Sequence, residues 1–174
     1  MSVVYALATP ASKSALCVFR VSGPGCLDSL QKMFSSPLAE PRKFYHRSVF
    51  YKGSLVDDVG VIFFKAPSSY TGEDSLEIYA HGGFAVMRSI VDLFKSLGFD
   101  EAGPGEFTKR AFINGKLSLN EAESVVDTIN NSSSELVSLS ASSLGGGFSK
   151  EVFGFSSRLD GFRKFIEGSI DFSD

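Results

Sequence analysis

The sequence contains few of the residues from which metal sites, disulfide frameworks and membrane spans are built. Its two cysteines, Cys17 and Cys26, have neither the spacing of a zinc site nor the number that a disulfide framework needs. The two histidines, His46 and His81, are too few to predict a histidine-based metal site or catalytic triad. No segment approaches the ~20 apolar residues of a membrane span, and the first residues lack the basic start of a signal peptide. We therefore expect a cytoplasmic protein in a reducing compartment, with no metal site and no membrane contact.

Nucleotide-binding and hydrolase motifs are also missing. The sequence has no G-x-x-x-x-G-K-[ST] loop, and the glycines at 145–147 have neither the spacing of that loop nor a preceding strand. It contains no G-x-G-x-x-G, G-x-S-x-G, C-x-x-C or H-E-x-x-H motif either. Lysine and arginine number 17 against 20 aspartates and glutamates, a net charge of -3, so no global basic field attracts a polyanion. We predict that this chain does not bind GTP or ATP in the P-loop manner, and that any RNA contact is local or made elsewhere.

What is present is the composition of a packed protein with two parts. The chain has 174 residues, of which 43% are hydrophobic and 21% charged. After residue 117 there is no proline, and the apolar residues recur with a helical period. Before it, strands are expected over residues 3–8, 15–22, 44–51, 56–64 and 76–80, and helices over 24–34 and 86–97. We predict an α+β domain over 1–117, with helices packed on a mixed or mostly antiparallel sheet.

Residues 118–174 read as part of a helical domain. Ser118 and Glu121 have the spacing of a capping box, which predicts that a helix begins there. Its apolar stripe extends to Leu139, and three glycines at 145–147 end it. A second helix is expected after Ser149, with apolar residues at 152, 155, 159, 162, 166 and 170. Both stripes are too wide for two helices to cover, so the helical domain looks incomplete. We expect a missing continuation of the chain, or another protomer, to cover them.

Three segments combine polar residues with glycine, and each is a weak signal alone. They span residues 8–23, 67–83 and 103–117. The first two carry Arg20 and Glu77 on strands, and each of these residues alone most simply lies on a solvated sheet face. The third carries Lys109 and Arg110, which most simply belong to a solvated run of cations.

Taken together and in order, these segments are specific. The chain carries Ala-Leu-Ala-Thr-Pro at 6–10, Arg-Val-Ser-Gly at 20–23, Pro-Arg at 41–42, Ala-Pro-x-Ser-Tyr-Thr-Gly-Glu-Asp at 66–74, Glu77, His-Gly-Gly at 81–83, Pro-Gly-Glu-Phe-Thr-x-Arg-Ala-Phe-x-Asn-Gly-Lys-Leu at 104–117, Glu-Ala-Glu at 121–123 and Ile-Asp-Phe at 170–172. In these residues it resembles the N-terminal portion of the tRNA modification GTPase family MnmE, also called TrmE. The resemblance covers the whole chain.

The resemblance implies a folate-binding, homodimerising domain followed by the first helices of a helical domain. Family members carry a G domain inserted in that helical domain, and it would hold the GTP, magnesium and potassium for which this chain has no site. With a flavoprotein partner of the MnmG (GidA) type, the family enzyme modifies carbon 5 of the wobble uridine of certain tRNAs. It takes the one-carbon unit from 5-formyl- or 5,10-methylene-tetrahydrofolate. By the same resemblance, the folate contacts fall on Arg20, Glu77 and Lys116, and no catalytic residue is assigned to this chain.

The physical chemistry of these residues suits a folate. A pterin presents a 2-amino group beside a ring N–H, and a carboxylate such as Glu77 accepts both. Arg20 and Lys116 would then meet a carbonyl or the carboxylates of the glutamyl tail. Tyr70 could stack on a ring, although a turn or core role fits equally well.

Two other interpretations remain open. The chain could be an assembly module that no longer binds folate, an alternative favoured by Ser12 and Ser14, which stand in a loop that is usually glycine-rich in the family. It could also be a stand-alone one-carbon transfer enzyme with Glu77 or Glu106 as base, although no tuned acid–base pair is legible.

Overall fold

The computed structural model describes residues 2–130, 133, 138 and 146–171. It divides into two compact units, Met1–Lys116 and Leu117–Asp174. Each unit is described by itself below.

The first unit is built on a six-stranded sheet in the order β3-β4-β5-β2-β1-β6. The strands are β1 Val4–Leu7, β2 Leu16–Ser22, β3 Phe44–Tyr51, β4 Ser54–Phe64, β5 Ser75–His81 and β6 Asp100–Glu101. Neighbouring strands are antiparallel except β1 and β6, which run parallel. The predicted α+β class with a mixed sheet is therefore confirmed.

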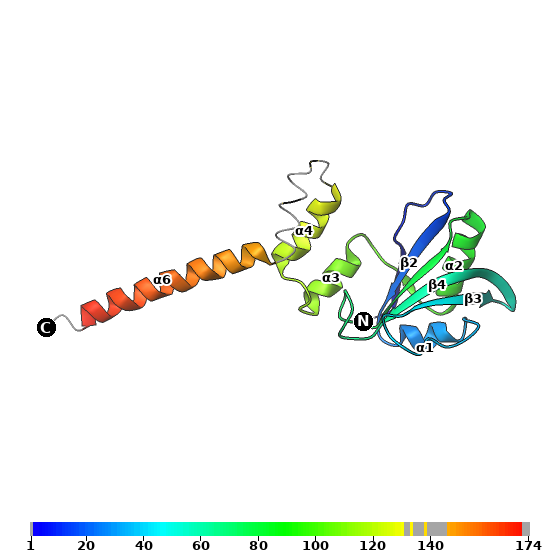
Figure 1. Cartoon of the computed structure of the whole chain (residues 1–174), viewed down its shortest axis with the longest axis horizontal. Helices are drawn as coiled ribbons and strands as arrows, with labels where there is room; N and C mark the ends of the chain where they lie inside the picture. The colour runs from blue at the N-terminus through cyan, green and yellow to red at the C-terminus, as the bar shows by residue number, and fades with distance from the viewer. Residues whose placement is uncertain (1, 131–132, 134–137, 139–145, 172–174) are drawn as a thin grey trace. The chain divides into compact units, whose positions relative to one another are not determined.

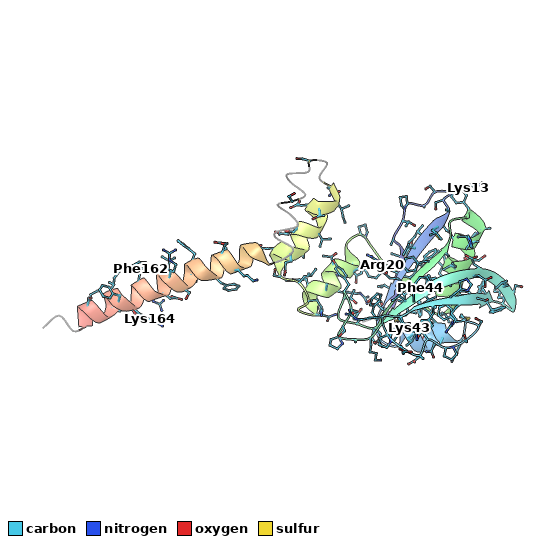
Figure 2. The ribbon with its side chains drawn as sticks, viewed as in Figure 1. Lys13, Arg20, Lys43, Phe44, Phe162 and Lys164 are labelled. Carbon is cyan, nitrogen blue, oxygen red and sulfur yellow. The ribbon has the colours of Figure 1, made fainter. Side chains whose placement is uncertain are left out.

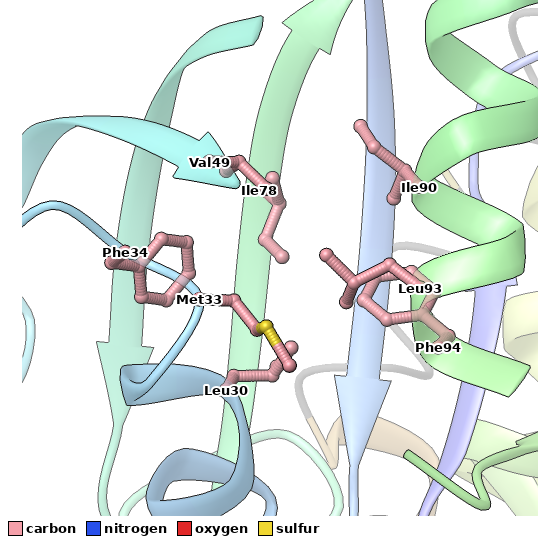
Figure 3. Close-up of a pocket in the computed structure, with 8 residues that line it drawn as sticks. All are labelled: Leu30, Met33, Phe34, Val49, Ile78, Ile90, Leu93 and Phe94. Carbon is pink, nitrogen blue, oxygen red and sulfur yellow. The ribbon is translucent and has the colours of Figure 1, made fainter. Parts of the chain in front are cut away.

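Two helices, α1 (Cys26–Gln31) and α2 (Phe84–Ser96), belong to the same unit as the sheet (Figure 1). Side chains from both helices, from the segment after α1 and from β3 and β5 meet in the core (Figure 3). The ring of Phe94 lies against those of Tyr5, Phe19 and Phe99, with centroids 4.9, 5.7 and 6.1 Å away. Burial of this apolar surface is the main favourable term in the stability of the unit.

The two faces of the sheet differ, because side chains alternate along each strand. Cys17, Phe19 and Val21 of β2 are buried, as the alternation predicts. On the same strand Leu16 and Arg20 are exposed, and this second face is called the open face below. The open face carries the side chains from which the candidate site is built.

Two elements of the first unit are absent from the sequence prediction. One is the short strand β6, and the other is α3 (Glu106–Ile113), which contains the two residues that the sequence analysis assigns to a solvated run of cations. The predicted helix over 24–34 also ends early, at Gln31. The chain then turns, and Phe34 forms an isolated bridge with Val49 of β3.

The second unit contains α4 (Leu119–Asn130) and α6 (Gly147–Asp171). The predicted capping box begins α4, since the backbone N–H of Ser118 donates to Oε2 of Glu121 at 2.7 Å and that of Glu121 donates to Oγ of Ser118 at 3.3 Å. The predicted continuation through Leu136 and Leu139 and the break at Gly145 lie outside the described residues.

The predicted apolar stripe of α6 consists of exposed side chains. Its predicted members Val152, Phe155, Leu159, Phe162, Ile166 and Ile170 are all exposed. Phe162 is labelled in Figure 2, together with Lys164 of the same helix. No helix in the part of the chain that the structure describes is long and apolar enough to cross a membrane.

Candidate functional site

Arg20 and Glu77 form an ion pair on the open face of the sheet. They sit directly opposite each other in the antiparallel register of β2 and β5, where side chains on one face touch. Nε of Arg20 donates to Oε1 of Glu77 at 3.0 Å, and the side chains are 52% and 23% exposed. The structure therefore brings together two of the three predicted folate contacts, within reach of a ligand.

Tyr79 completes this pair, and the sequence analysis did not select it. Its hydroxyl donates to Oε2 of Glu77 at 2.7 Å. That hydrogen bond, together with partial burial, raises the pKa of Tyr79 above its usual range, so the phenol remains a donor at neutral pH. The signal was present in the sequence, because residues 77 and 79 share one face of a strand.

The carboxylate of Glu77 has accepting capacity left. A carboxylate offers about four lone-pair sites, two on each oxygen. Arg20 uses one site on Oε1 and Tyr79 uses one on Oε2. Among the contacts of the described residues, one site on each oxygen is left for a ligand edge with two adjacent donors.

An aromatic ring lies beside these polar groups. Phe44, labelled with Arg20 in Figure 2, is 61% exposed. Its ring lies over Gly60, where any side chain would collide with it, and its centroid is 6.0 Å from that of Tyr79. The open face thus combines a polar pair with apolar surface, the combination found in sites for small organic ligands.

Lys116, the third predicted contact, lies against the loop that precedes β5. Its Nζ donates to the carbonyl oxygen of Pro67 at 3.1 Å. Its stem packs on Gly72, where a Cβ would lie 3.2 Å from Cγ of Lys116. The hydroxyl of Tyr70 is 3.0 Å from that of Thr108 on α3, and the tyrosine is 47% exposed. Lys116 therefore contacts this loop, and Tyr70 belongs to it and contacts α3. Arg20 and Glu77, in contrast, pair on the strands.

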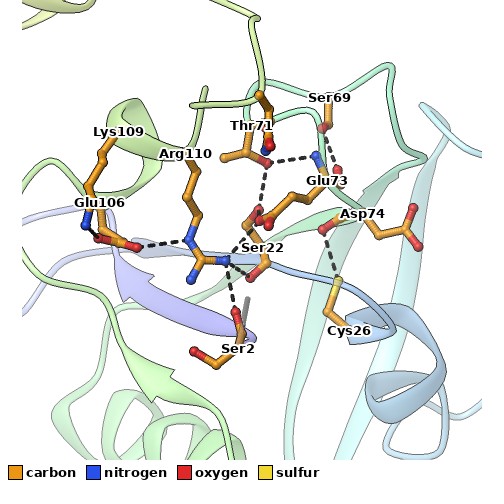
Figure 4. A network of polar contacts seen from close by, with 11 residues as sticks. Ser2, Ser22, Cys26, Ser69, Thr71, Glu73, Asp74, Glu106, Lys109 and Arg110 are labelled. Atoms are coloured by element: carbon orange, nitrogen blue, oxygen red, sulfur yellow. Dashed lines mark hydrogen bonds and ion pairs between the residues drawn. The ribbon is translucent and has the colours of Figure 1, made fainter. Parts of the chain in front are cut away.

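A buried polar network holds the same loop against α3 (Figure 4). Arg110 is only 3% exposed. Its Nη1 donates to Oε2 of Glu73 and to the carbonyl oxygen of Ser2, both at 2.9 Å. Its Nε donates to Oε1 of Glu106 at 3.1 Å. Ser22 also donates to Glu73, at 2.9 Å. The interpretation of Arg110 as part of a solvated run is therefore wrong, because two carboxylates and a backbone carbonyl compensate its burial.

Charge pairing in this network sets the protonation of its members. Burial disfavours the charged guanidinium, but the hydrogen bonds to Glu73 and Glu106 outweigh it and raise the pKa of Arg110. The hydrogen bond from Arg110 in turn lowers the pKa of Glu106. Glu106 is therefore held as an anion, which does not suit the alternative role of a general base near neutral pH.

His81 ends β5 beside Asp57. Its Nδ1 lies 2.7 Å from Oδ1 of Asp57, and its backbone N–H donates to Oδ2 at 2.8 Å. Among the described residues, no group of three or more histidine, cysteine or carboxylate side chains is placed to hold a metal ion.

The amino-acid sequence of the chain matches a known family. Residues 3–116 match the family model for the N-terminus of the GTP-binding protein TrmE. The tRNA modification GTPase MnmE of Thermotoga petrophila is 41% identical over 175 aligned positions, which cover 100% of this chain and 39% of the relative. The MnmE proteins of Pseudothermotoga lettingae and Neorickettsia sennetsu are 42% and 37% identical, with 98% and 100% of this chain covered, and 38% and 32% of the relatives. The chain thus spans less than half the length of these relatives. It belongs to the MnmE (TrmE) family of tRNA modification GTPases, and it matches the N-terminal part of that family's proteins.

Proposed function

We propose that this chain binds a reduced folate, 5-formyl- or 5,10-methylene-tetrahydrofolate, through Arg20, Glu77 and Lys116. The observation that carries the proposal is the Arg20–Glu77 pair on the open face, whose carboxylate keeps one accepting site on each oxygen. A pterin edge carries two adjacent donors, the 2-amino group and a ring N–H, and fits that arrangement.

The neighbouring groups suit the rest of a pterin. In the described part of the chain Arg20 is bonded only through Nε, so its two terminal amino groups are left to donate to a ring carbonyl. The exposed ring of Phe44 offers apolar surface to a flat heterocycle. Tyr79 stiffens the Glu77 carboxylate, which reduces the ordering that binding requires.

In this proposal the chain is the one-carbon donor portion of a GTPase that acts on carbon 5 of the wobble uridine of tRNA. GTP, magnesium and potassium belong to a G domain that this sequence does not encode, and a flavoprotein of the MnmG type is the partner of the complete protein. The relatives are tRNA modification GTPases by name, which supports this context. The chain forms a homodimer through its first unit and is inactive as a GTPase alone.

Isothermal titration of 5-formyltetrahydrofolate into the purified chain tests folate binding. Loss of a hydrogen bond to a charged group costs about 1.5–3 kcal/mol, so Arg20→Ala and Glu77→Gln should each weaken binding by roughly 10- to 100-fold. Arg88→Ala on α2, an exposed arginine of the helix-covered side, is the matched control and should bind as the wild type does. Unchanged affinity in Glu77→Gln with binding abolished in Arg20→Ala would show that Glu77 does not read the pterin.

A second candidate function, an assembly module without folate, is favoured by the exposed stripes of the second unit. Ile129 of α4 and Phe153 and Phe165 of α6 are each at least 74% exposed, and large apolar surfaces of this kind mark protein contacts. Sedimentation velocity across a concentration series, combined with the folate titration, separates the two functions. Association without any folate heat would favour the assembly module.

A further inference from the structure

Two cationic side chains of the first unit, Arg42 and Lys116, contact the loop between β4 and β5. Arg42 precedes this loop in the sequence and Lys116 follows it. Nη2 of Arg42 donates to the carbonyl oxygen of Ser68 at 2.8 Å, and Nζ of Lys116 donates to that of Pro67 at 3.1 Å. Carbonyl oxygens of consecutive residues are only a few ångströms apart, so the two cationic groups lie within about 11 Å of each other. Both side chains are exposed.

In the part of the chain that the structure describes, neither cation forms an ion pair with a carboxylate. Among the ion pairs of the described residues, those near this loop are Lys65–Asp74, Lys43–Glu40 and the Arg110 network with Glu73 and Glu106. Arg42 and Lys116 remain as two positive charges whose contacts in the described chain are backbone carbonyls, which leave further donors on each group.

The backbone is shaped to present these two side chains. Arg42 has a φ of 61°, a left-handed conformation that is costly for a residue with a Cβ, while its N–H donates to the carbonyl oxygen of Phe63 at the end of β4. Gly72, with a φ of 76°, lets the stem of Lys116 pass close to the loop. Arg47 is a contrast, because its three guanidinium nitrogens all donate to carbonyls of residues 36, 37 and 46, which is a purely structural use.

The position of these charges relative to Glu77 suggests their ligand. Glu77 is two residues from Ser75, the first residue of β5, and the loop at 67–68 lies just beyond that end. Phe44 of β3 and Glu77 both lie opposite Ile62 of β4, and Arg42 is two residues before Phe44. With about 4.8 Å between neighbouring strands and about 3.3 Å per residue along a strand, the backbone of Arg42 is on the order of 10 Å from that of Glu77. A folate carries its carboxylates at the end opposite its pterin, separated from it by an aminobenzoyl group.

We infer that Arg42 and Lys116 form a subsite for the γ-linked glutamate carboxylates of a polyglutamylated folate. The carbonyl oxygens of Ser68 and Pro67 hold the two cationic side chains in place. The inference rests on the proposed folate function and adds Arg42, and a preference for extended glutamyl tails, to it. Arg42 supplies a planar fork that meets a carboxylate bidentately, whereas Lys116 supplies a point charge. Two isolated charges suit a short polycarboxylate better than a nucleic acid backbone, which needs a basic stripe.

The test compares 5-formyltetrahydrofolate carrying one glutamate with the same compound carrying three, by titration calorimetry. The wild type should bind the triglutamyl form on the order of tenfold more tightly at low salt, and less so at high salt, because exposed charge pairs are screened. Arg42→Gln should reduce that ratio to near one, and Arg42→Lys should retain part of it. Lys52→Gln, at the β3–β4 turn and therefore at the opposite end of β4, is the matched control and should keep the full ratio.

The affinity ratio is insensitive to a purely structural role of Arg42, because a folding defect weakens both ligands alike. An unchanged ratio in Arg42→Gln overturns the inference even if the folate itself binds. Where neither folate binds the wild type, tri-γ-glutamate alone is added and the backbone amides of residues 65–69 are followed by ¹H–¹⁵N NMR. Shifts that disappear in Arg42→Gln support the anion subsite while refuting the proposed folate function. No shifts, or shifts given only by a short RNA oligonucleotide, overturn the inference.

Discussion

Replacement of Arg110 by methionine tests the physical account of the buried network most directly. The substitution removes the guanidinium but keeps most of the side-chain volume, so it isolates the electrostatic effect from a cavity effect. It leaves the Glu73 carboxylate, whose side chain is only 11% exposed, with the Ser22 hydroxyl but without a cation.

Breaking one side of a buried ion pair costs about 3–5 kcal/mol, because the remaining charge is buried without compensation. The Ser22 hydrogen bond keeps the expectation near the lower end, about 3 kcal/mol. For a denaturant slope of about 1–3 kcal/mol per molar urea, the unfolding midpoint should fall by roughly 1–3 M. Lys109→Gln is the control, since the exposed Lys109–Glu106 pair contributes at most about 0.5 kcal/mol.

Tyrosine fluorescence during urea unfolding is the assay. The chain has 5 tyrosines and no tryptophan, and all the tyrosines precede residue 117, so the signal reports on the first unit alone. The double variant Glu73→Gln with Arg110→Met should be more stable than Arg110→Met by itself, because it removes the uncompensated charge. The reasoning is refuted if Arg110→Met lowers the midpoint no more than Lys109→Gln does, or if the double variant recovers nothing.

The difference in stability between the wild type and Arg110→Met should depend on pH. Arg110 lowers the pKa of Glu106 in the folded state, so this pair stabilises the fold above the unfolded pKa of about 4.3 and loses that effect as the pH falls through the lowered value. Arg110→Met lacks this contribution. The stability difference between wild type and variant should therefore narrow on acidification below about pH 4.

Three further predictions concern other parts of the chain. Gly82→Ala places a Cβ 2.6 Å from the backbone oxygen of Ser14 and should cost about 1–3 kcal/mol in urea unfolding, whereas Gly83→Ala, with nothing within 4 Å, should cost no more than an ordinary surface change. Equal losses in the two variants would contradict the close approach. Burial raises the pKa of Cys26 to about 12, so its thiol should react with a disulfide reagent at pH 8 only when the unit unfolds, and rapid labelling of the native chain would contradict that burial. Ser118→Ala removes the cap of α4 and should lower its helicity, by about 1 kcal/mol of helix stability, with amide hydrogen exchange as the measurement and unchanged exchange as the contrary result.

Much of the sheet was predictable because its signals are local. Alternation along a strand needs no knowledge of the partner strand, and it correctly predicts one buried face of β2 with Cys17, Phe19 and Val21. The strands predicted over 44–51 and 56–64 are two apolar runs around a short connection, and they pair as β3 and β4. The parallel pairing of β1 with β6 was not predictable, because β6 has only two residues and its register depends on contacts remote in the sequence.

The site was predictable in part, for a related reason. The family motifs assigned Arg20, Glu77 and Lys116 to the candidate folate site. The amino-acid sequence alone could not show that Arg20 and Glu77 face each other, because this depends on the register of two strands. Arg110 was misread because its carboxylate partner Glu73 lies far away in the sequence and a lone arginine is usually solvated. Arg42 belongs to the family motif Pro-Arg at 41–42, but its left-handed backbone and its contact with Ser68 are properties of the folded chain and could not be predicted from the sequence.

The place of β1 inside the sheet has a consequence for synthesis on the ribosome. The hairpin of β1 and β2 is complete once residue 22 has emerged, yet the outer side of β1 is covered by β6 at Asp100 and Glu101, and Ser2 is bonded by Arg110. At about 5–20 residues per second, the nascent chain therefore carries an uncovered strand edge for roughly 4–16 seconds. Such an edge is a template for pairing with another chain. The edge of β1 is therefore covered only after residue 101 has left the exit tunnel and β6 has paired with it.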